Sequence, residues 1–497
     1  MDDLLPFAHT LLFVTVALLV AVGSNRLAER IRVPAPALFL LTAAVASDVV
    51  PELGRLGPVD NQRIVTVALA VILFDGGMHI GWQRMRPSLA GVVWLGVAGT
   101  VVTTAALAVT AHALLGFDWT TALILGAALA PTDPAVVFSV LGRREVTGRS
   151  GTLLEGESGA NDPVGIALMV SLLAVSGSGW HAVGEGLGHF ALQLVLGGLF
   201  GAGGGWLLLQ LMRRMPLPNP ALYPVQTTAF ALLLYGATTS VEGSGFLAVF
   251  VAGVLVGDER APYKREIEQF ASALAGLGEI VAFVVLGLSI DLGSILRGDR
   301  PWVGLVLAVL LVVVIRPLLV GLVLAPLRLT TGERGFILFS GLKGAVPILL
   351  GTYVLAEGAD RGQEVYDVVF VVVLVSVVVQ GGLVPTVARL LGVPMRVTEP
   401  EPWSLGMRFR ERPDGLHRYV VAEGSLADGC TLADLDVGES FWVSMVGRDG
   451  RLVQVRGDTV LRAGDEVLAL AEEGASPDDV FTVPVSDGDG TAAPDGG

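Results

Sequence analysis

Eight ionisable residues lie inside segments that are otherwise apolar. They are Asp75, Asp133, Glu155, Glu157, Asp162, Glu279, Arg316 and Lys343. A charged side chain at the centre of a lipid bilayer costs at least about 2.5–3.5 kcal/mol on insertion scales, so such residues mark ion or proton pathways. These residues therefore predict a protein that moves ions across a membrane.

The first group of interest is Pro131-Thr132-Asp133-Pro134, in the middle of the apolar segment 118–141. Each proline removes an amide donor and clashes with the preceding helical turn, so the sequence predicts a helix break around Asp133. Freed carbonyls and half-helix ends bind cations in transporters with broken helices. Thr132 and Asp133 are therefore candidate ligands of a cation.

The next apolar segment, 150–176, contains three acids: Glu155, Glu157 and Asp162. Helical spacing places Ser158 and Asp162 on one face, with Glu155 nearly on the same stripe and Glu157 elsewhere. One acid can then face an ion cavity while another pairs with a distant base. A carboxylate in a narrow wet cavity can hold either a proton or a metal cation, and Asp162 is the candidate for this competition. The neighbouring Asn161 is neutral, which suggests one proton per cation.

Two bases, Arg316 and Lys343, lie in later apolar segments. A buried base without a partner is very costly, so we expect Glu157 to pair with Arg316. Lys343 is bracketed by Gly341, Gly344 and Pro347, which predicts a second broken helix. Interruptions at corresponding positions of two halves indicate an inverted repeat with its site between the halves.

Asp75 and Glu279 leave two interpretations equally open. Asp75 follows Leu73-Phe74 near the predicted cytoplasmic end of its segment. Each acid is either part of a funnel or gate, or a charge that reaches water at a helix end.

The elements that must position these residues are membrane helices. The 497 residues are 53% hydrophobic and 16% charged, against about 25% charged in soluble domains. A membrane helix needs about 20 mostly apolar residues, and the first begins directly after Met1-Asp2-Asp3, so it is interpreted as a span and not a signal peptide. We predict thirteen spans, at 5–24, 33–50, 63–80, 88–115, 118–141, 150–176, 187–212, 221–240, 244–257, 270–291, 301–327, 334–356 and 365–390, of which the ninth is short enough to be re-entrant.

The orientation follows from the short loops, because Lys and Arg collect on the cytoplasmic side. Alternate loops carry fifteen basic residues, and the opposite set carries five. The prediction is an N-terminus outside the cell membrane and a cytoplasmic C-terminus.

Composition also argues against several other classes of protein. The single cysteine, Cys430, excludes an internal disulfide and any site built from several cysteines. No basic stripe suited to nucleic acid is present. We expect no cofactor in the membrane part.

Residues 397–497 form a separate acidic unit, with 20 acids and 8 bases. Short strand patterns and an Asp449-Gly450 hairpin signal predict a small α+β domain over 397–474. Residues 475–497, rich in Asp, Gly and Pro, are predicted to be disordered.

Four segments together resemble the NhaP-type cation/proton antiporters. They are Phe74-Asp75-Gly76-Gly77, Pro131-Thr132-Asp133-Pro134, Glu157-Ser158-Gly159-Ala160-Asn161-Asp162-Pro163 and Gly341-Leu342-Lys343-Gly344. The resemblance covers residues 5–390 and implies a thirteen-helix NhaA-like fold of inverted repeats with two crossing broken helices, a homodimer, and electroneutral exchange by an elevator-like movement.

Carried to this sequence, the resemblance assigns a role to each matching residue. Asp162 would bind the cation or the proton, with Asp133, Thr132 and Ser158 at the same site. Asn161 would stabilise it, and Glu157 with Arg316 would form a structural ion pair. Asp75, Lys343, Glu155 and Glu279 would be accessory. Lys343 stands where the family commonly has Arg, and Asp75 where sodium-specific members often have Glu.

The C-terminal unit resembles the C-terminal lobe of potassium-transport regulatory domains, in Arg448-Asp449-Gly450 and in Leu461-Arg462-Ala463-Gly464-Asp465-Glu466. Such a lobe favours potassium as the exchanged cation, with sodium as the alternative. No Gly-x-Gly-x-x-Gly fingerprint is present, which argues against NAD. A nucleotide or cyclic dinucleotide is a candidate ligand, and a dimerising or solubilising role is the alternative.

Two other classes of function fit these residues less well than exchange does. An intramembrane serine protease would use Ser158 in Gly156-Glu157-Ser158-Gly159, but it needs a base within reach, and no histidine sits in the middle of a later span. A cation channel with a regulatory tail would need a continuous pore, whereas one interrupted helix in each half favours alternating access.

Overall fold

A computed structural model describes most of the chain. It covers residues 34–50, 57–141, 144–146, 149–174, 180–258, 263–296, 300–327, 329–359, 361–397, 416–435, 441–448, 451–471 and 478–481, with residues 8, 12, 15, 16 and 19–24. Half of the predicted first span, 5–24, lies outside the described residues. The chain divides into two compact units, residues 1–399 and 400–497.

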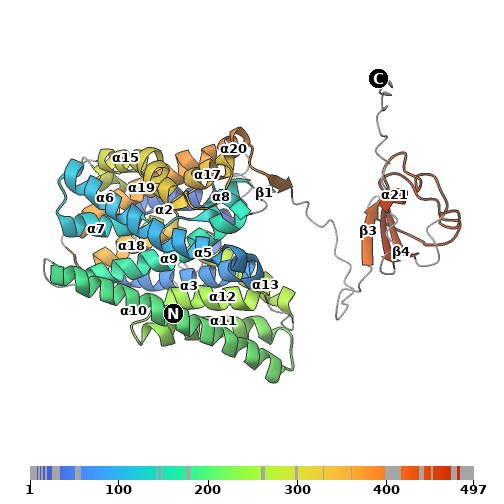
Figure 1. Cartoon of the computed structure of the whole chain (residues 1–497), viewed down its shortest axis with the longest axis horizontal. Helices are drawn as coiled ribbons and strands as arrows, with labels where there is room; N and C mark the ends of the chain where they lie inside the picture. Colours follow the sequence, from blue (N-terminus) through green and yellow to red (C-terminus); the bar gives the residue numbers. More distant parts are fainter. Residues whose placement is uncertain are drawn as a thin grey trace, which may run out of the picture. The chain divides into compact units, whose positions relative to one another are not determined.

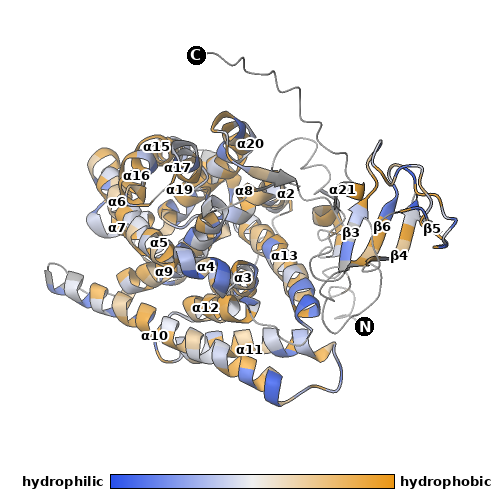
Figure 2. Cartoon of the chain, turned by 45° about the vertical axis from the view of Figure 1, so that its right-hand side comes forward, coloured by the Kyte–Doolittle hydropathy of each residue, from blue (hydrophilic) through white to orange (hydrophobic). Residues whose placement is uncertain are grey.

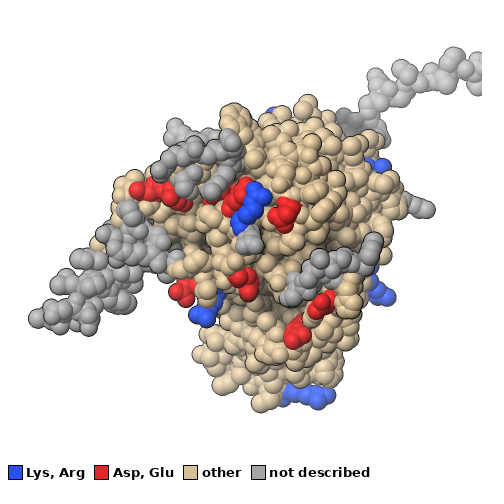
Figure 3. All heavy atoms as spheres, turned by 90° about the vertical axis from the view of Figure 1, so that its left-hand side faces the viewer, with Lys and Arg blue, Asp and Glu red and all other residues tan. Residues whose placement is uncertain are grey.

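The larger unit is a bundle of apolar helices (Figure 1). Among the described residues, six helical stretches are long and apolar enough to cross a membrane: Pro58–Ile80, Trp82–Leu115, Gly184–Arg214, Lys264–Leu288, Pro301–Leu324 and Gly362–Leu390. Four shorter apolar helices accompany them. Figure 2 shows hydrophobic residues along most of the helices, and on the face in Figure 3 charged side chains are few.

One group of helices packs around α3 and α12. Its members are α2 (Ala35–Val49), α3 (Pro58–Ile80), α10 (Trp180–Arg214), α11 (Leu222–Thr239), α12 (Gly245–Asp258) and α13 (Lys264–Leu288). Helices α10 and α11 lie beside α12, and α10 also packs against α9 (Figure 1). The short α12 is the predicted ninth span.

A second group contains the remaining helices. The first half is α4 (Trp82–Met85), η2 (Arg86–Ser88), α5 (Leu89–Trp94), η3 (Leu95–Gly99), α6 (Thr100–Leu115), α7 (Trp119–Leu129), α8 (Pro134–Leu141) and α9 (Arg149–Ala174). The second half is α14 (Leu292–Leu296), α15 (Arg300–Leu310), η4 (Leu311–Val320), α16 (Gly321–Leu324), α17 (Thr331–Phe339), α18 (Ala345–Ala356), α19 (Gly362–Val375), η5 (Ser376–Gln380) and α20 (Gly381–Leu390).

Two helices of this group are interrupted where the sequence predicts it. Helix α7 ends at Leu129 and α8 begins at Pro134, so the break holds Thr132 and Asp133. Helix α17 ends at Phe339 and α18 begins at Ala345, so the second break holds Lys343. Pro163, in contrast, is accommodated inside the continuous α9.

Three stretches of this group are π-helical, a feature that the sequence does not predict: η3, η4 and η5, of which η4 spans ten residues. π-Helical turns occur mostly as single turns inside α-helices, often at functional sites. In η4 the turn contains Pro317, which lacks the amide proton that a regular α-helix uses. Each π turn belongs to a helix that carries or supports the predicted site.

A two-stranded sheet ties the end of the helical unit to the loop after α8. Strand β1 (Arg144–Val146) pairs antiparallel with β2 (Met395–Val397), with Val146 opposite Met395. Val146 is buried, and Met395 packs against the same core. The residues that lead to the C-terminal unit are thus held beside the segment that joins α8 to α9.

The C-terminal unit contains a four-stranded antiparallel sheet in the order β3-β6-β4-β5. The strands are β3 (Leu416–Val420), β4 (Phe441–Arg448), β5 (Arg451–Val453) and β6 (Glu466–Ala471). Strands β4 and β5 pair as the hairpin signal predicts, with Arg448 opposite Arg451, although the two turn residues lie outside the described residues.

The boundary predicted for the disordered tail needs a correction. Residues Asp478–Phe481 form the short helix α21. The Phe481 ring is fully buried and stacks on Tyr419 at 4.7 Å between ring centroids. An aromatic side chain inside a mainly polar stretch is enough to attach this turn to the sheet, so the folded unit extends past residue 474.

Candidate functional site

The two helix breaks lie against each other and share hydrogen bonds. The Asp133 amide donates to the Leu342 carbonyl at 2.8 Å. The Lys343 ammonium donates to the carbonyls of Ala130 and Pro131 at 3.0 and 2.9 Å. Lys343 is almost fully buried, so its charge is met by backbone carbonyls that the first break has freed.

Close approach at the crossing depends on glycine. A Cβ on Gly344 would lie 1.8 Å from an Asp133 carboxylate oxygen and 2.4 Å from the Asp133 Cβ. A Cβ on Gly341 would lie 2.0 Å from the Arg316 guanidinium carbon. Gly344 is therefore required for the contact of the second break with the first, and Gly341 leaves room for the Arg316 guanidinium.

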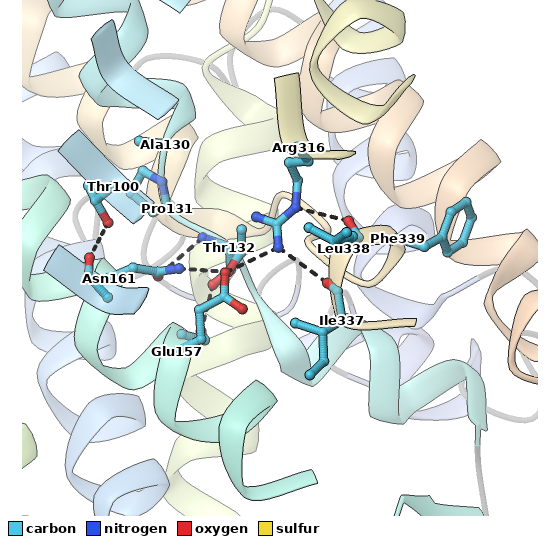
Figure 4. A network of polar contacts seen from close by, with 12 residues as sticks. Thr100, Ala130, Pro131, Thr132, Glu157, Asn161, Arg316, Ile337, Leu338 and Phe339 are labelled. Atoms are coloured by element: carbon cyan, nitrogen blue, oxygen red, sulfur yellow. Dashed lines mark hydrogen bonds and ion pairs between the residues drawn. The ribbon is translucent and has the colours of Figure 1, made fainter. Parts of the chain in front are cut away.

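Helix α9 supports the first break with uncharged side chains. The Ser158 hydroxyl donates to the Thr132 carbonyl at 2.5 Å. The Asn161 amide nitrogen donates to the Thr132 hydroxyl at 2.7 Å, and its oxygen accepts from the Thr132 N–H at 3.2 Å. Figure 4 shows the Asn161 side chain pointing at Thr132. Asn161 thus fixes the position of Thr132 through two hydrogen bonds, one to its hydroxyl and one from its backbone N–H.

Asp162 is buried beside this support. Its side chain belongs to a residue that is 8% exposed, and within the described part of the chain its Oδ1 has no hydrogen-bond partner. The charged groups that act on it electrostatically are Asp133 and Lys343. Because no described protein group donates to it, this oxygen is available as a ligand for a cation or a proton.

Glu157 turns away from Asp162 to an ion pair. Its carboxylate lies 3.1 Å from the Arg316 guanidinium, and the two side chains are 5% and 2% exposed. Arg316 also donates to the carbonyls of Leu338 and Ile337 at 3.0 and 3.3 Å (Figure 4). Arg316 therefore joins α9 to the end of α17.

The predicted accessory acids lie in different places. Asp75 accepts from the Ser272 hydroxyl at 3.0 Å, with His79 at 3.4 Å. Glu155 lies 3.8 Å from Arg84. Glu279, on α13, lies within the electrostatic reach of Asp133. The structure thus brings together Thr132, Asp133, Ser158, Asn161, Asp162 and Lys343, and it places Asp75 and Glu155 in other contacts.

Ser158 lacks the neighbour that a protease would need. Its hydroxyl is used by the Thr132 carbonyl, and among the described residues no histidine bonds to it. The site suits cation binding and proton exchange better, because it brings the carboxylates of Asp133 and Asp162 beside side-chain hydroxyls inside an apolar helical unit.

Two site residues escaped the sequence analysis. Ser376 accepts from the Lys343 N–H at 3.0 Å, and Gln380 donates to the Phe339 carbonyl at 2.5 Å. The sequence does mark them, because Ser376 and Gln380 are the only polar residues in the valine-rich segment 368–380.

Comparison with known proteins gives matches over both units. Residues 14–390 match the family "sodium/hydrogen exchanger, transmembrane", and residues 416–476 match the TrkA-C domain. The chain is 33% identical to the K⁺/H⁺ antiporter NhaP of Alkalimonas amylolytica, over 94% of this chain and 82% of that protein. It is 32% identical to the K⁺/H⁺ antiporter NhaP2 of Shewanella sp. strain MR-4, over 93% and 81%.

The fold has solved counterparts. The structure of the sodium proton antiporter MjNhaP1 from Methanocaldococcus jannaschii matches with a TM-score of 0.67 and 21% identity, over 78% of this chain and 99% of that one. A more distant relative in sequence, the Na⁺/H⁺ antiporter NhaH of Halobacillus dabanensis, is 28% identical over 67% of this chain and 84% of that protein. The chain belongs to the transmembrane sodium/hydrogen exchanger family.

Proposed function

We propose that this protein is a secondary antiporter that exchanges K⁺ for H⁺ across the cell membrane, with Asp162 as the group that carries either ion. The observation that carries the proposal is the buried Asp162 carboxylate beside two crossing helix breaks, with one oxygen unpartnered among the described residues. The match of residues 14–390 to the exchanger family and the names of the relatives support cation/proton exchange as the activity.

The proposed chemistry is a competition at one carboxylate. When Asp162 is ionised it attracts a monovalent cation, for which Thr132, Asp133 and Ser158 supply further oxygens. When it is protonated the cation leaves, because the neutral acid no longer compensates the charge of the cation. Asn161 stays neutral in both states, so one cation exchanges for one proton and the cycle is electroneutral.

The neighbouring charges have supporting roles in this proposal. The Glu157–Arg316 pair is structural, because both charges are already neutralised at 3.1 Å. Lys343 compensates the carbonyls of the first break. Asp75, Glu155 and Glu279 are proposed as accessory acids.

Potassium is proposed over sodium because of the full-length relatives. Those that share both the membrane part and the tail are named K⁺/H⁺ antiporters. Sodium is the second candidate, favoured by the names of NhaH and of the solved structural counterpart.

The finer architecture is part of the proposal. We infer thirteen membrane helices in NhaA-like inverted repeats, a homodimer, an N-terminus outside and a cytoplasmic C-terminus. Support comes from the two interrupted helices, each followed by a helix that braces it, and from the alternation of basic loops. The TrkA-C unit, 416–476, is proposed to regulate exchange, with a nucleotide or cyclic dinucleotide as ligand.

The test is fluorescence dequenching in everted membrane vesicles that carry the protein. After a pH gradient is formed, potassium, sodium, lithium and rubidium are added in turn. The proposal expects proton efflux with potassium at the lowest half-saturating concentration. Proton efflux with sodium alone would make sodium the exchanged cation, and no efflux with any of the four would contradict antiport.

A further inference from the structure

Ser376 and Gln380, on the π-helical turn η5, form a polar pair that the exchange chemistry does not use. Both are buried, at 3% and 5% exposure. The Ser376 hydroxyl donates to the Gln380 side-chain oxygen at 2.8 Å. Burying an uncharged polar side chain costs free energy unless it forms hydrogen bonds. The hydrogen bonds of Ser376 and Gln380 therefore indicate why polar residues stand at these positions.

The pair spans both sides of the second helix break. Gln380 donates to the carbonyl of Phe339, the last residue of α17. Ser376 accepts from the N–H of Lys343, two residues before α18 begins. These two side chains, from one helical turn, therefore hold Phe339 and Lys343 at a fixed separation across the break.

Gln380 completes the cap of α17 that Arg316 begins. The last four carbonyls of a helix have no partner inside it. Here Ser340 N–H donates to Phe336, Arg316 donates to Ile337 and Leu338, and Gln380 donates to Phe339. All four carbonyls are therefore satisfied at the point where the chain turns toward Lys343.

The first break is braced by a similar pair of residues, although both of them contact Thr132. There the bracing residues are Ser158 and Asn161, from the helix that follows the break. In the second half Ser376 and Gln380 also come from the helix that follows, and their spacing of four instead of three lies in a π turn, which takes more residues. Each break is braced by one serine and one side-chain amide.

The two braces differ at the next residue. Asn161 is followed by Asp162, whereas Gln380 is followed by Gly381. A Cβ on Gly381 would lie 3.0 Å from Pro34 Cγ and 3.1 Å from Leu342 Cδ2, so any larger side chain there would have to displace these neighbours. The second brace therefore positions groups without offering a carboxylate to a cation.

We propose that Ser376 and Gln380 are positioning residues for exchange. They hold the second break so that Lys343 reaches the carbonyls of Ala130 and Pro131, and so that Leu342 accepts from Asp133. In this way they set the cation affinity and the pH response of the Asp162 site. The inference rests on the proposed function of that site.

The test compares two matched pairs of variants. Gln380→Met and Ser376→Ala remove the brace, and Ser376→Thr keeps its hydroxyl. Gln193→Met and Ser171→Ala remove a second Gln–Ser hydrogen bond, of 3.2 Å, which lies away from both breaks. Apparent KM for potassium, maximal rate and the pH profile are measured by dequenching in everted vesicles, with sodium as a second cation, and thermal unfolding is followed on the purified proteins.

Loss of the brace should raise apparent KM roughly three- to tenfold, as expected when a buried carbonyl loses its donor. It should also displace the pH profile, whereas Ser376→Thr and both control variants stay close to the unchanged protein. Lower thermal stability with unchanged KM and pH profile in Ser376→Ala and Gln380→Met would overturn the inference while exchange itself stands. Failure of the proposed function would instead appear as no cation-driven proton efflux in the unchanged protein.

Discussion

The guanidinium of Arg316 and the carboxylate of Glu157 meet at 3.1 Å, with almost no exposure of either side chain. Arg316 also donates to two carbonyls at the end of α17. Those contacts need a planar group with several donors. Arg316 therefore positions the end of α17 in addition to neutralising Glu157.

Breaking this pair should destabilise the helical unit strongly. Glu157→Gln leaves the buried guanidinium without a counter-charge, and we expect a loss of about 3–5 kcal/mol in the free energy of unfolding. Arg316→Lys should also destabilise, because one ammonium does not reproduce the guanidinium contacts. Thermal unfolding in detergent is the measurement, and Arg63→Gln, in the exposed pair with Asp60, is the control. Equal effects of Glu157→Gln and Arg63→Gln would contradict the role of burial.

The crossing of the breaks should not tolerate a methyl group at residue 344. Gly344→Ala places a Cβ 1.8 Å from an Asp133 oxygen, so the two breaks must separate. We expect exchange to be lost or reduced at least about tenfold, equivalent to about 1.4 kcal/mol at the crossing. Gly198→Ala, on α10, meets no atom within 4 Å and is the matched control. Normal exchange in Gly344→Ala, measured by dequenching, would show that the contact at residue 344 is dispensable.

Much of this site is predictable because its signals are local. Pro131 and Pro134 indicate the first break, Gly341 and Gly344 the second, and the need to neutralise buried charges indicates the pair of Glu157 with Arg316. The partners of Lys343 are not predictable in the same way, since backbone carbonyls carry no sequence signal and only the crossing of two helices exposes those of Ala130 and Pro131. The pairing of β1 with β2 joins residues about 250 apart in the chain, and short strands at such separation have no distinguishing pattern.

Strand β2, at the end of the helical unit, pairs with β1 in the segment that joins α8 to α9. A chain that ends at residue 399 keeps β2, and we expect it to retain exchange but to lose regulation by the tail. A chain that ends at residue 393 also removes Met395 and the partner of β1. Exchange rates and pH profiles of the two truncations, at matched membrane levels, are the measurement.

The two truncations separate regulation from folding. The shorter chain should have the lower exchange rate, because the segment between α8 and α9 has lost its paired strand. Equal rates in both would show that the strand pair does not support the site. Complete loss in the longer chain, with normal insertion, would mean that the tail does more than regulate.

In the C-terminal unit, Asp465 should make stability depend on pH. Burial alone would raise the pKa of Asp465, but hydrogen bonds from Arg448 at 2.7 and 2.6 Å and from the Arg462 N–H at 2.8 Å hold the pKa below its usual value. The folded pKa lies below the unfolded value of about 3.9, so the stabilisation is complete above that pH and is lost as the pH falls through the folded pKa.

Asp465→Asn should remove that dependence at a cost of about 2–4 kcal/mol at neutral pH. Urea unfolding of residues 400–497 between pH 3 and pH 7 measures it, since this unit has a core of its own. Asp458→Asn is the control on the same unit. An unfolding free energy of Asp465→Asn that falls as steeply below about pH 4 as that of the unchanged unit would contradict the assignment.

The most direct test of the account replaces Asp162 with asparagine, which keeps the shape of the side chain and removes its ability to ionise. Cation-driven proton efflux from everted vesicles is measured for Asp162→Asn and for Asp60→Asn, an exposed acid in the first turn of α3, at equal amounts of inserted protein. The account predicts full efflux with Asp60→Asn and none above background with Asp162→Asn for any alkali cation. Efflux by Asp162→Asn at the rate of the unchanged protein would contradict it.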